Sequence, residues 1–237
     1  MTARYDTIGL NYADLRRPDP RIASHIDAAL GDARQIVNVG AGAGSYEPTD
    51  RDVVAVEPSV EMIAQRAADA APAIQGSAEH LPFDHDSFDA AMVVLTIHHW
   101  SDQAKGLAEM RRVSCGPVVL LTFDPAFREI WLLDYLPQLA ALDERQMPSM
   151  PDYERWLGPA AVTPVPIPHD CTDGFLYAYW RRPAAYLDPR IRKGSSSFWA
   201  IDGAEEGLAR LEADLESGAW EERYGHLLER DAIDLGY

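Results

Sequence analysis

Three glycines and one carboxylate are the residues of this 237-residue chain whose types and spacing point most directly to binding chemistry. Gly40, Gly42 and Gly44 follow one apolar, β-branched run, and Glu57 follows the next such run. Glycine is needed where a backbone turns sharply and must approach a ligand without a Cβ atom in the way. A carboxylate just beyond a neighbouring strand can accept hydrogen bonds from both hydroxyls of a ribose. Together these residues predict a site for a nucleotide-like ligand, although glycines also end strands in proteins that bind nothing.

The glycine spacing distinguishes two classes of cofactor. A dinucleotide site is typically G-x-G-x-x-G followed by a helix whose N-terminus faces the pyrophosphate. Here position 45 is Ser45, and only residues 45–51 separate the turn from the next predicted strand. A βαβ crossover usually needs about 10–12 residues, so we expect one or two helical turns at most, or an irregular segment. S-adenosylmethionine has no phosphate, so the spacing favours it over NAD.

Candidate catalytic side chains follow two later strands. His98 and His99 come after the fourth predicted strand, and Asp124 comes after the fifth. A histidine near its ordinary pKa can take a proton at physiological pH. The alternatives are a cap on the strand–helix junction for the histidines and a helix cap for Asp124. His169, in a later loop, is a further candidate base, although a surface histidine is the commoner case.

The elements that must position these residues alternate between short apolar runs and helix-period segments. This pattern predicts an α/β fold with a doubly wound, mostly parallel sheet. Strands are expected at residues 35–39, 52–56, 73–76, 88–96 and 117–123, and helices at residues 59–70, with Ser59 as N-cap, and 101–113.

After residue 124 the chain changes character. Expected there are helical segments over residues 127–145, 153–157, 204–216 and 220–230, a strand within 161–167, and a segment dense in Phe, Tyr and Trp over 175–198. The pattern predicts a helical, aromatic-rich cap on the substrate side, with most of the aromatic side chains forming its core.

Composition excludes several classes of function. The formal charge is −17, from 21 basic and 38 acidic residues, so nucleic acid is not an expected partner. No run approaches the ~18 apolar residues of a membrane span. The N-terminal residues also show no signal-peptide pattern, so we expect a cytoplasmic protein without a membrane partner. The two cysteines predict neither a disulfide framework nor a metal site.

Four ordered motifs resemble the class I S-adenosylmethionine-dependent methyltransferases. They are Val-Asn-Val-Gly-Ala-Gly-Ala-Gly at residues 37–44, Val-Ala-Val-Glu-Pro-Ser at 54–59, Gly-Ser-Ala-Glu-His-Leu-Pro-Phe at 76–83 and Ser-Phe-Asp-Ala-Ala-Met-Val-Val-Leu at 87–95. The resemblance is to the small-molecule group that includes the ubiquinone and menaquinone C-methyltransferases.

The resemblance implies a Rossmann-like sheet of the seven-stranded type and three regions. Residues 1–34 would form N-terminal lid helices, residues 35–124 the cofactor-binding half, and residues 125–237 the substrate-side half with helical insertions and the last strands. The final residues look like the approach to a last strand, part of which we expect to lie beyond residue 237.

The resemblance also implies roles for individual residues. The three glycines would line the methionine part of the cofactor, Leu95 and Thr96 would lie under the methyl group, and Asn38 stands where the family usually has Asp or Glu. An amide oxygen still accepts a hydrogen bond from the methionine ammonium, but without the ion pair. The remaining implied cofactor contacts are Glu57 and Pro58 at the ribose, Met62, Ala78 and Glu79 around the adenine, and Tyr5, Tyr12 and Arg16 closing from the N-terminus.

The resemblance thus implies an enzyme that moves a methyl group from S-adenosylmethionine to O, N or C of a small organic acceptor. The aromatic content of the cap makes an apolar or aromatic acceptor a reasonable hypothesis. Two alternatives stay open. The first, which Asn38 keeps open, is an S-adenosylmethionine-binding protein without transferase activity, and the second is an NAD-dependent oxidoreductase. We expect a monomer or a homodimer.

Overall fold

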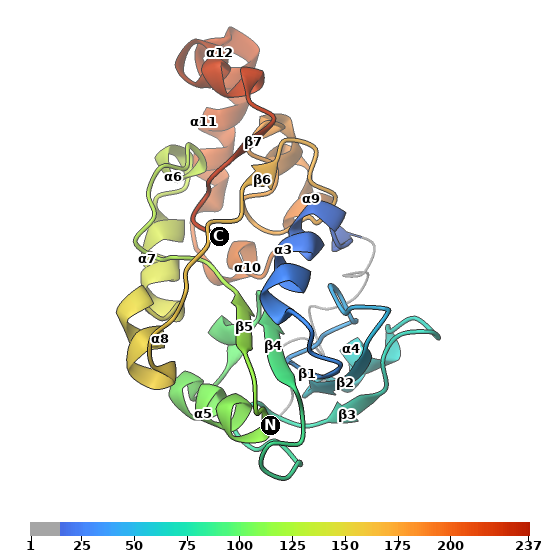
Figure 1. The fold of residues 1–237 in the computed structure, drawn as a ribbon. Coiled ribbons are helices and arrows are strands. Elements are labelled where there is room, and N and C mark those ends of the chain that lie inside the picture. The colour runs from blue at the N-terminus through green and yellow to red at the C-terminus, as the bar shows by residue number, and fades with distance from the viewer. Residues whose placement is uncertain (1–14) are drawn as a thin grey trace.

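A five-stranded parallel sheet is the centre of the computed structural model, which describes residues 15–237 (Figure 1). Its order is β3-β2-β1-β4-β5, so the predicted doubly wound sheet is confirmed. The strand order reverses beside β1, and ligands of such sheets bind outside the carboxyl ends of the strands at that point. The strands are β1 Gln35–Val39, β2 Asp52–Glu57, β3 Ala73–Gln75, β4 Ala90–Val94 and β5 Val118–Leu121.

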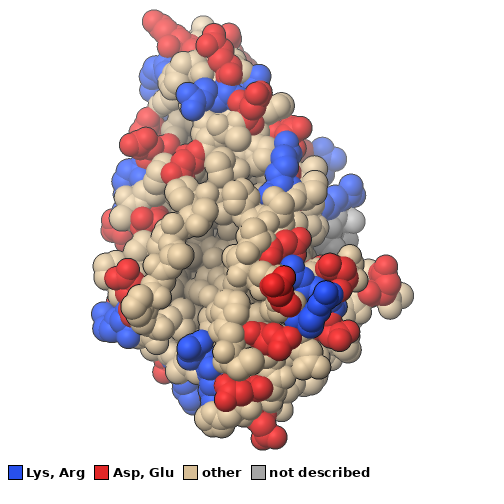
Figure 2. Space-filling view, in the orientation of Figure 1, with Lys and Arg blue, Asp and Glu red and all other residues tan. Residues whose placement is uncertain are grey.

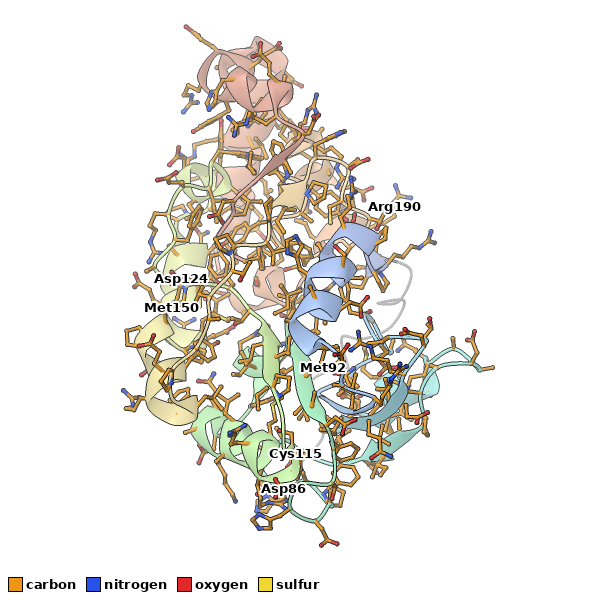
Figure 3. All side chains as sticks on the ribbon, viewed as in Figure 1. Asp86, Met92, Cys115, Asp124, Met150 and Arg190 are labelled. Atoms are coloured by element: carbon orange, nitrogen blue, oxygen red, sulfur yellow. The ribbon has the colours of Figure 1, made fainter. Side chains whose placement is uncertain are left out.

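The two faces of the sheet are covered by different helices. Ile36 and Met92 belong to the core cluster that includes the buried face of α3 (Pro20–Leu30), and Figure 3 labels Met92 on the sheet. Val37 belongs to a second cluster, with the buried side chains of α5 (Gln103–Val113). Successive side chains of a strand point to opposite faces, so strands apolar on both sides are buried on both sides.

The connections between the first three strands contain little helix. Residues 45–51 contain turns and no helix, as the short first crossover implies. The side chain of Ser59 accepts a hydrogen bond from the Met62 N–H, which confirms it as the N-cap of α4 (Val60–Ala64). The expected extension of this helix to residue 70 is wrong, because Arg66 turns back to the glycine turn and β3 begins at residue 73.

The boundaries around β4 also differ from those predicted. Helix α5 begins at Gln103 and not at residue 101, and its N-cap Asp102 accepts a hydrogen bond from the Lys105 N–H. Strand β4 ends before Leu95, whose φ of 50° is incompatible with extended backbone. Phe88, predicted as the start of this strand, forms an isolated bridge with Ser114 instead.

The cap follows β5 and continues to the C-terminus, with α11 and α12 at the end of the molecule farthest from the sheet (Figure 1). The prediction of a strand within residues 161–167 is mostly wrong, because the strand found there, β6, comprises only Ile167–Pro168. Strand β6 pairs antiparallel with β7, Ala232–Ile233. Pro164 and Pro166 have no N–H to donate to a ladder. The other elements after β4 are η1 Ile97–His99, α6 Leu132–Tyr135, α7 Gln138–Gln146, α8 Met150–Leu157, η2 Pro183–Leu187, α9 Pro189–Arg192, α10 Ser197–Ala200, α11 Ala204–Ser217, α12 Ala219–Tyr224 and η3 Gly225–Glu229.

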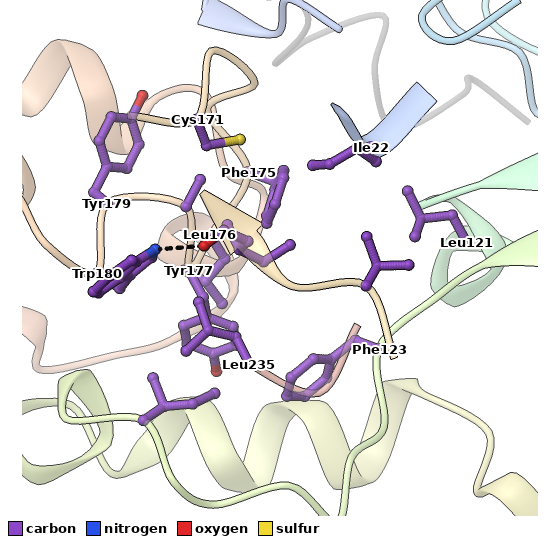
Figure 4. Close-up of a cluster of buried hydrophobic side chains, with 14 of the residues drawn as sticks. Ile22, Leu121, Phe123, Cys171, Phe175, Leu176, Tyr177, Tyr179, Trp180 and Leu235 are labelled. Atoms are coloured by element: carbon purple, nitrogen blue, oxygen red, sulfur yellow. Dashed lines mark hydrogen bonds between the residues drawn. The ribbon is translucent and has the colours of Figure 1, made fainter. Parts of the chain in front are cut away.

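The aromatic residues of the cap are mainly its core, as predicted. Trp180 is 1% exposed, and its indole N–H donates to the carbonyl of Ile167 (3.0 Å; Figure 4). Trp131 donates in turn to the carbonyl of Trp180 (2.7 Å). The same cluster includes Ile22 and Leu121, so the cap and one face of the sheet share a continuous core.

A search of residues 15–237 for a helix both long enough and apolar enough to cross a membrane finds none.

Candidate active site

The glycine turn has the backbone conformation that its residue types require. Gly40, Gly42 and Gly44 have φ values of 70°, 54° and 96°, a region that residues with a Cβ atom rarely adopt. Glu57 at the end of β2 holds the turn, because its Oε2 accepts a hydrogen bond from the Gly42 N–H (2.8 Å) while Oε1 accepts one from the Ser59 N–H (2.9 Å). The structure therefore brings the predicted glycines and carboxylate together.

The turn also lies in close contact with two other side chains predicted near the cofactor. A Cβ atom on Gly40 would lie 2.5 Å from Thr96 Cγ2, and one on Gly42 would lie 3.3 Å from Met62 Cε. The carboxyl end of β4 and the first turn of α4 therefore pack directly on the glycines. At Gly40, close packing requires glycine independently of any ligand.

Asn38 has an acidic neighbour that sequence reasoning missed. Its Nδ2 donates to Glu47 Oε1 (3.0 Å), and Glu47 forms a buried ion pair with Arg66 (2.6 Å). Arg66 also donates to the carbonyl of Gly42 (3.2 Å). Among the described residues, Asn38 Oδ1 is buried without a hydrogen-bond partner. The Glu47 carboxylate thus lies beside Asn38, the position at which the resembling methyltransferases usually have an acidic residue. The sequence contains one indication of this, because Glu47 lies in the short crossover that directly follows the glycines.

Glu79 has a structural role at the start of α5. Its Oε1 accepts hydrogen bonds from the Ser101 N–H and hydroxyl (both 2.8 Å) and from the Asp102 N–H (3.1 Å). Burial opposes its ionisation, but these hydrogen bonds prevail and lower the pKa of the carboxyl. Ala78 is buried against α5 close to Gly106, and the carbonyl of Pro58 accepts from the Gln75 side chain.

A pocket opens next to the glycine turn, at the carboxyl ends of β4 and β5. Its empty space, including open solvent, is about 620 Å³. Leu95 lines it in the left-handed conformation described above, immediately before the Thr96 that packs on Gly40. Figure 2 shows a hollow on this face with uncharged visible walls, near the C-terminus marked in Figure 1. The lining residues are Arg16, Leu95, His98, Phe123, Asp143, Gln146, Met147, Phe175, Leu176, Tyr177, Ser195, Ser196, Ser197 and Tyr237.

Asp143, which sequence reasoning missed, is a buried carboxylate on the pocket wall. It is 9% exposed, and its Oδ2 accepts a hydrogen bond from the Tyr177 hydroxyl (2.7 Å). Burial raises the pKa of Asp143 to about 6, against the opposing effects of Tyr177 and of the Arg128 charge. The available signal was helical spacing, because Asp143 lies four residues after the buried Leu139 and therefore on the same face of α7.

Arg16 lies in the same pocket, where it is held by another carboxylate. Its Nε donates to Asp173 Oδ1 (2.5 Å) and its Nη2 to Oδ2 (3.3 Å), and Tyr46 also donates to Asp173 (3.0 Å). Its predicted role as part of an N-terminal closure stays a prediction. Tyr5 and Tyr12, predicted with it, lie outside the described residues.

The three predicted catalytic residues are placed differently. His98 lines the pocket, whereas His99 and Asp124 are not among its lining residues. Asp124 accepts a hydrogen bond from the Ala126 N–H (2.9 Å), as expected if it caps the segment that follows it. Figure 3 labels Asp124 near the helices α7 and α8. His169 is in the β6 region and does not line the pocket either.

Comparisons with known proteins agree with this geometry. A family described as "Methyltransferase domain" matches residues 37–116. A solved structure of a putative methyltransferase from an antibiotic biosynthesis pathway of Anabaena variabilis is 36% identical, covers 95% of this chain and 97% of its own, and has a TM-score of 0.88.

Two curated relatives match a shorter region. An uncharacterised methyltransferase of Mycobacterium tuberculosis (strain H37Rv) is 38% identical over 34% of this chain and 35% of its own length. A ubiquinone/menaquinone biosynthesis C-methyltransferase of Citrifermentans bemidjiense is 38% identical over 28% of this chain and 32% of its own. The chain thus spans about a third of the length of these two curated relatives.

Proposed function

We propose, from the premise that this chain belongs to the class I S-adenosylmethionine-dependent methyltransferases, that it transfers a methyl group from S-adenosylmethionine to O, N or C of a small organic acceptor. The observation that carries this proposal is the continuity between Gly40 and the pocket. Thr96 packs on Gly40, and the preceding Leu95 lines the pocket, so the two candidate binding regions share the carboxyl end of β4.

The residues at the glycine turn fit the proposed cofactor. Asn38 Oδ1, buried without a partner among residues 15–237, is an acceptor for the methionine ammonium, whereas the charge of Glu47 beside it is paired with Arg66. Glu57 would hold the ribose, since each of its oxygens can accept more than the one backbone hydrogen bond named above. When bound, the cofactor supplies a methyl carbon made electrophilic by its sulfonium.

His98 is the proposed base, because it lines the pocket three residues after Leu95. An acceptor oxygen or nitrogen that attacks a methyl group has a proton to lose, and a histidine can take it near neutral pH. The helix η1 places His98 at the end of β4, where we expect the methyl group to point. His99 and Asp124 are not among the residues that line the pocket.

The pocket supports a small acceptor. Aromatic and aliphatic side chains form half of its lining, with a few polar groups among them, which is typical of small-molecule sites. The similar protein of Anabaena variabilis, described as a methyltransferase from an antibiotic biosynthesis pathway, also supports a small-molecule acceptor. The NAD alternative is disfavoured by residues 45–51, which form no helix to face a pyrophosphate.

Calorimetry with S-adenosylhomocysteine tests the cofactor site. The wild type should bind it, Glu57→Gln should bind at least about tenfold more weakly because a charge-assisted hydrogen bond is lost, and the exposed Glu61→Gln should match the wild type. Absence of binding to the wild type would overturn the proposed function, as would NADH binding in preference.

Release of S-adenosylhomocysteine from S-adenosylmethionine, followed over a panel of small acceptors, tests transfer itself. His98→Asn should lower kcat with little change in cofactor affinity, and the loss should be largest at neutral pH. Cofactor binding with no turnover across the panel would instead support the non-catalytic alternative.

A further inference from the structure

We propose that the pocket recognises an acceptor that carries a positively charged amine on an apolar or aromatic body, and that Asp143 is its counter-ion. This acceptor class rests on the proposed function and narrows it. It does not specify which atom of the acceptor receives the methyl group.

Among residues 15–237, no cation on the pocket wall forms an ion pair with Asp143. Arg16 is the lining guanidinium, and its double hydrogen bond to Asp173 neutralises it. Arg128 affects Asp143 through its charge but does not line the pocket, and it forms an ion pair with Glu144. The described part of the wall, with Arg16 compensated by Asp173, therefore has a negative net charge, which favours a cationic ligand and disfavours an anionic one.

The hydrogen bonding of Asp143 is incomplete on the pocket side. A carboxylate has about four acceptor positions. Among residues 15–237, the side-chain donor to Asp143 is the Tyr177 hydroxyl, which donates to Oδ2. Burying a charge without enough donors is costly. An ammonium group in the pocket would supply both the missing donors and the opposite charge, since it has up to three N–H groups.

The aromatic wall suits the same ligand. Tyr237 lies between Phe123 and Phe175, with ring centroids 5.3 and 4.7 Å away, and Phe123 is 5.3 Å from Tyr177. Aromatic faces attract cations and also bury apolar bodies. The acidic chain adds a field that attracts cations, with a formal charge of −17.

The charge of Asp143 sets the pH range of this recognition. The titratable side chains that share the pocket wall are Arg16, His98, Tyr177 and Tyr237. Burial raises the pKa values of both tyrosines, so they stay neutral. Because the pKa of Asp143 is about 6, the carboxylate is charged at pH 7.5, and amine affinity should fall as the pH drops below 6.

Matched probes of one shape test the proposal, measured by calorimetry on the full chain saturated with S-adenosylhomocysteine. The probes are 2-phenylethylamine, 2-phenylethanol and 3-phenylpropanoate, extended to further arylalkyl amines with their alcohols. At pH 7.5 the wild type should bind the amines at least about tenfold more tightly than the alcohols, which corresponds to about 1.4 kcal/mol, and bind the carboxylate least. Asp143→Asn should remove this preference while S-adenosylhomocysteine affinity is unchanged.

Glu212→Gln, which removes an exposed carboxylate from α11, is the matched control and should keep the preference. Equal or tighter binding of the alcohols, persistence of the amine preference in Asp143→Asn, or failure of every amine to bind would overturn the proposal. Because cofactor binding is measured separately, loss of amine preference with intact S-adenosylhomocysteine binding leaves the proposed methyl transfer standing. Loss of both contradicts the proposed function itself.

Discussion

Individual glycines of the turn meet two requirements at once, a backbone conformation with positive φ and close contact with neighbouring residues. Gly40 has a positive φ and lies against Thr96, while Gly42 gives its N–H to Glu57. The predicted pairing of the glycines with Glu57 therefore has a structural basis before any ligand is considered. Residue types alone could predict a tight turn, but not that Thr96 limits the space above Gly40.

Gly40→Ala should destabilise the protein by more than about 2 kcal/mol, because left-handed strain of roughly 1–2 kcal/mol adds to a contact of 2.5 Å with Thr96 Cγ2. Gly203→Ala is the matched control, since Gly203 has the same φ of 70° and no atom within 4 Å. It should cost the strain alone. Urea unfolding measures both, and adding Thr96→Ala should recover part of the Gly40→Ala loss; equal losses at the two glycines would refute the steric argument.

Asp143→Asn should stabilise the protein at high pH. Folding raises the pKa of this carboxyl from 3.8 to about 6, so the native state binds the proton more tightly than the unfolded chain. The resulting stability is fully present below about pH 4 and is lost as the pH rises through 6, a difference of roughly 3 kcal/mol. Urea unfolding at pH 8 should show a gain of up to this size for Asp143→Asn.

At pH 4 the same variant should gain nothing, and Glu212→Gln should show no such pH dependence. A variant that is more stable and yet loses amine binding would fit the common exchange of stability for function at a binding site. Equal effects at pH 4 and pH 8 would exclude a buried, titrating carboxylate.

At the scale of elements, local sequence indicated the strands and helices of residues 35–124, and tertiary contacts moved their ends. Helix α4 stops at Ala64 because Arg66 returns to the glycine turn, and the start of α5 is held by Glu79 from a distant loop. The two N–H groups that Glu79 accepts from are at the junction before the helix, where no helical carbonyl is available.

Glu79→Ala should lower the free energy of unfolding by about 1–3 kcal/mol, because the Ser101 and Asp102 N–H groups lose their acceptor. Glu61→Ala, an exposed acid on α4, should change it little. Thermal unfolding, paired with calorimetry of S-adenosylhomocysteine, separates two roles. Unchanged stability with weakened cofactor binding would favour the adenine contact that the family resemblance implies.

At the scale of the whole molecule, one core joins the sheet to the cap. Ile22 and Leu121 from the sheet side share a cluster with Tyr177 and Trp180 from the cap. The pocket lies where the two regions meet, with Leu95 on one side and Asp143 on the other. The predicted boundary at residue 124 therefore separates regions of different character that have a common core.

Because of this shared core, the two halves should unfold in one cooperative transition. Five of the six tryptophans follow residue 124, so tryptophan fluorescence reports mainly on the cap and far-ultraviolet circular dichroism on the whole chain. The two thermal curves should coincide, and S-adenosylhomocysteine at about 100 times its Kd should stabilise both by about 2.7 kcal/mol. A cap transition that is separate and insensitive to the ligand would contradict this.

The sequence by itself determined the doubly wound sheet, the glycine turn with Glu57, the short irregular crossover and the methyltransferase resemblance. Each of these is written in residues close together along the chain, through strand periodicity, glycine spacing and ordered motifs. The tertiary structure alone decided that Glu47 reaches Asn38, that Arg16 pairs with Asp173 across 157 positions, and that Asp143 faces a pocket. Such pairs follow from how elements pack, and no local pattern specifies which distant side chains the packing brings within hydrogen-bond distance.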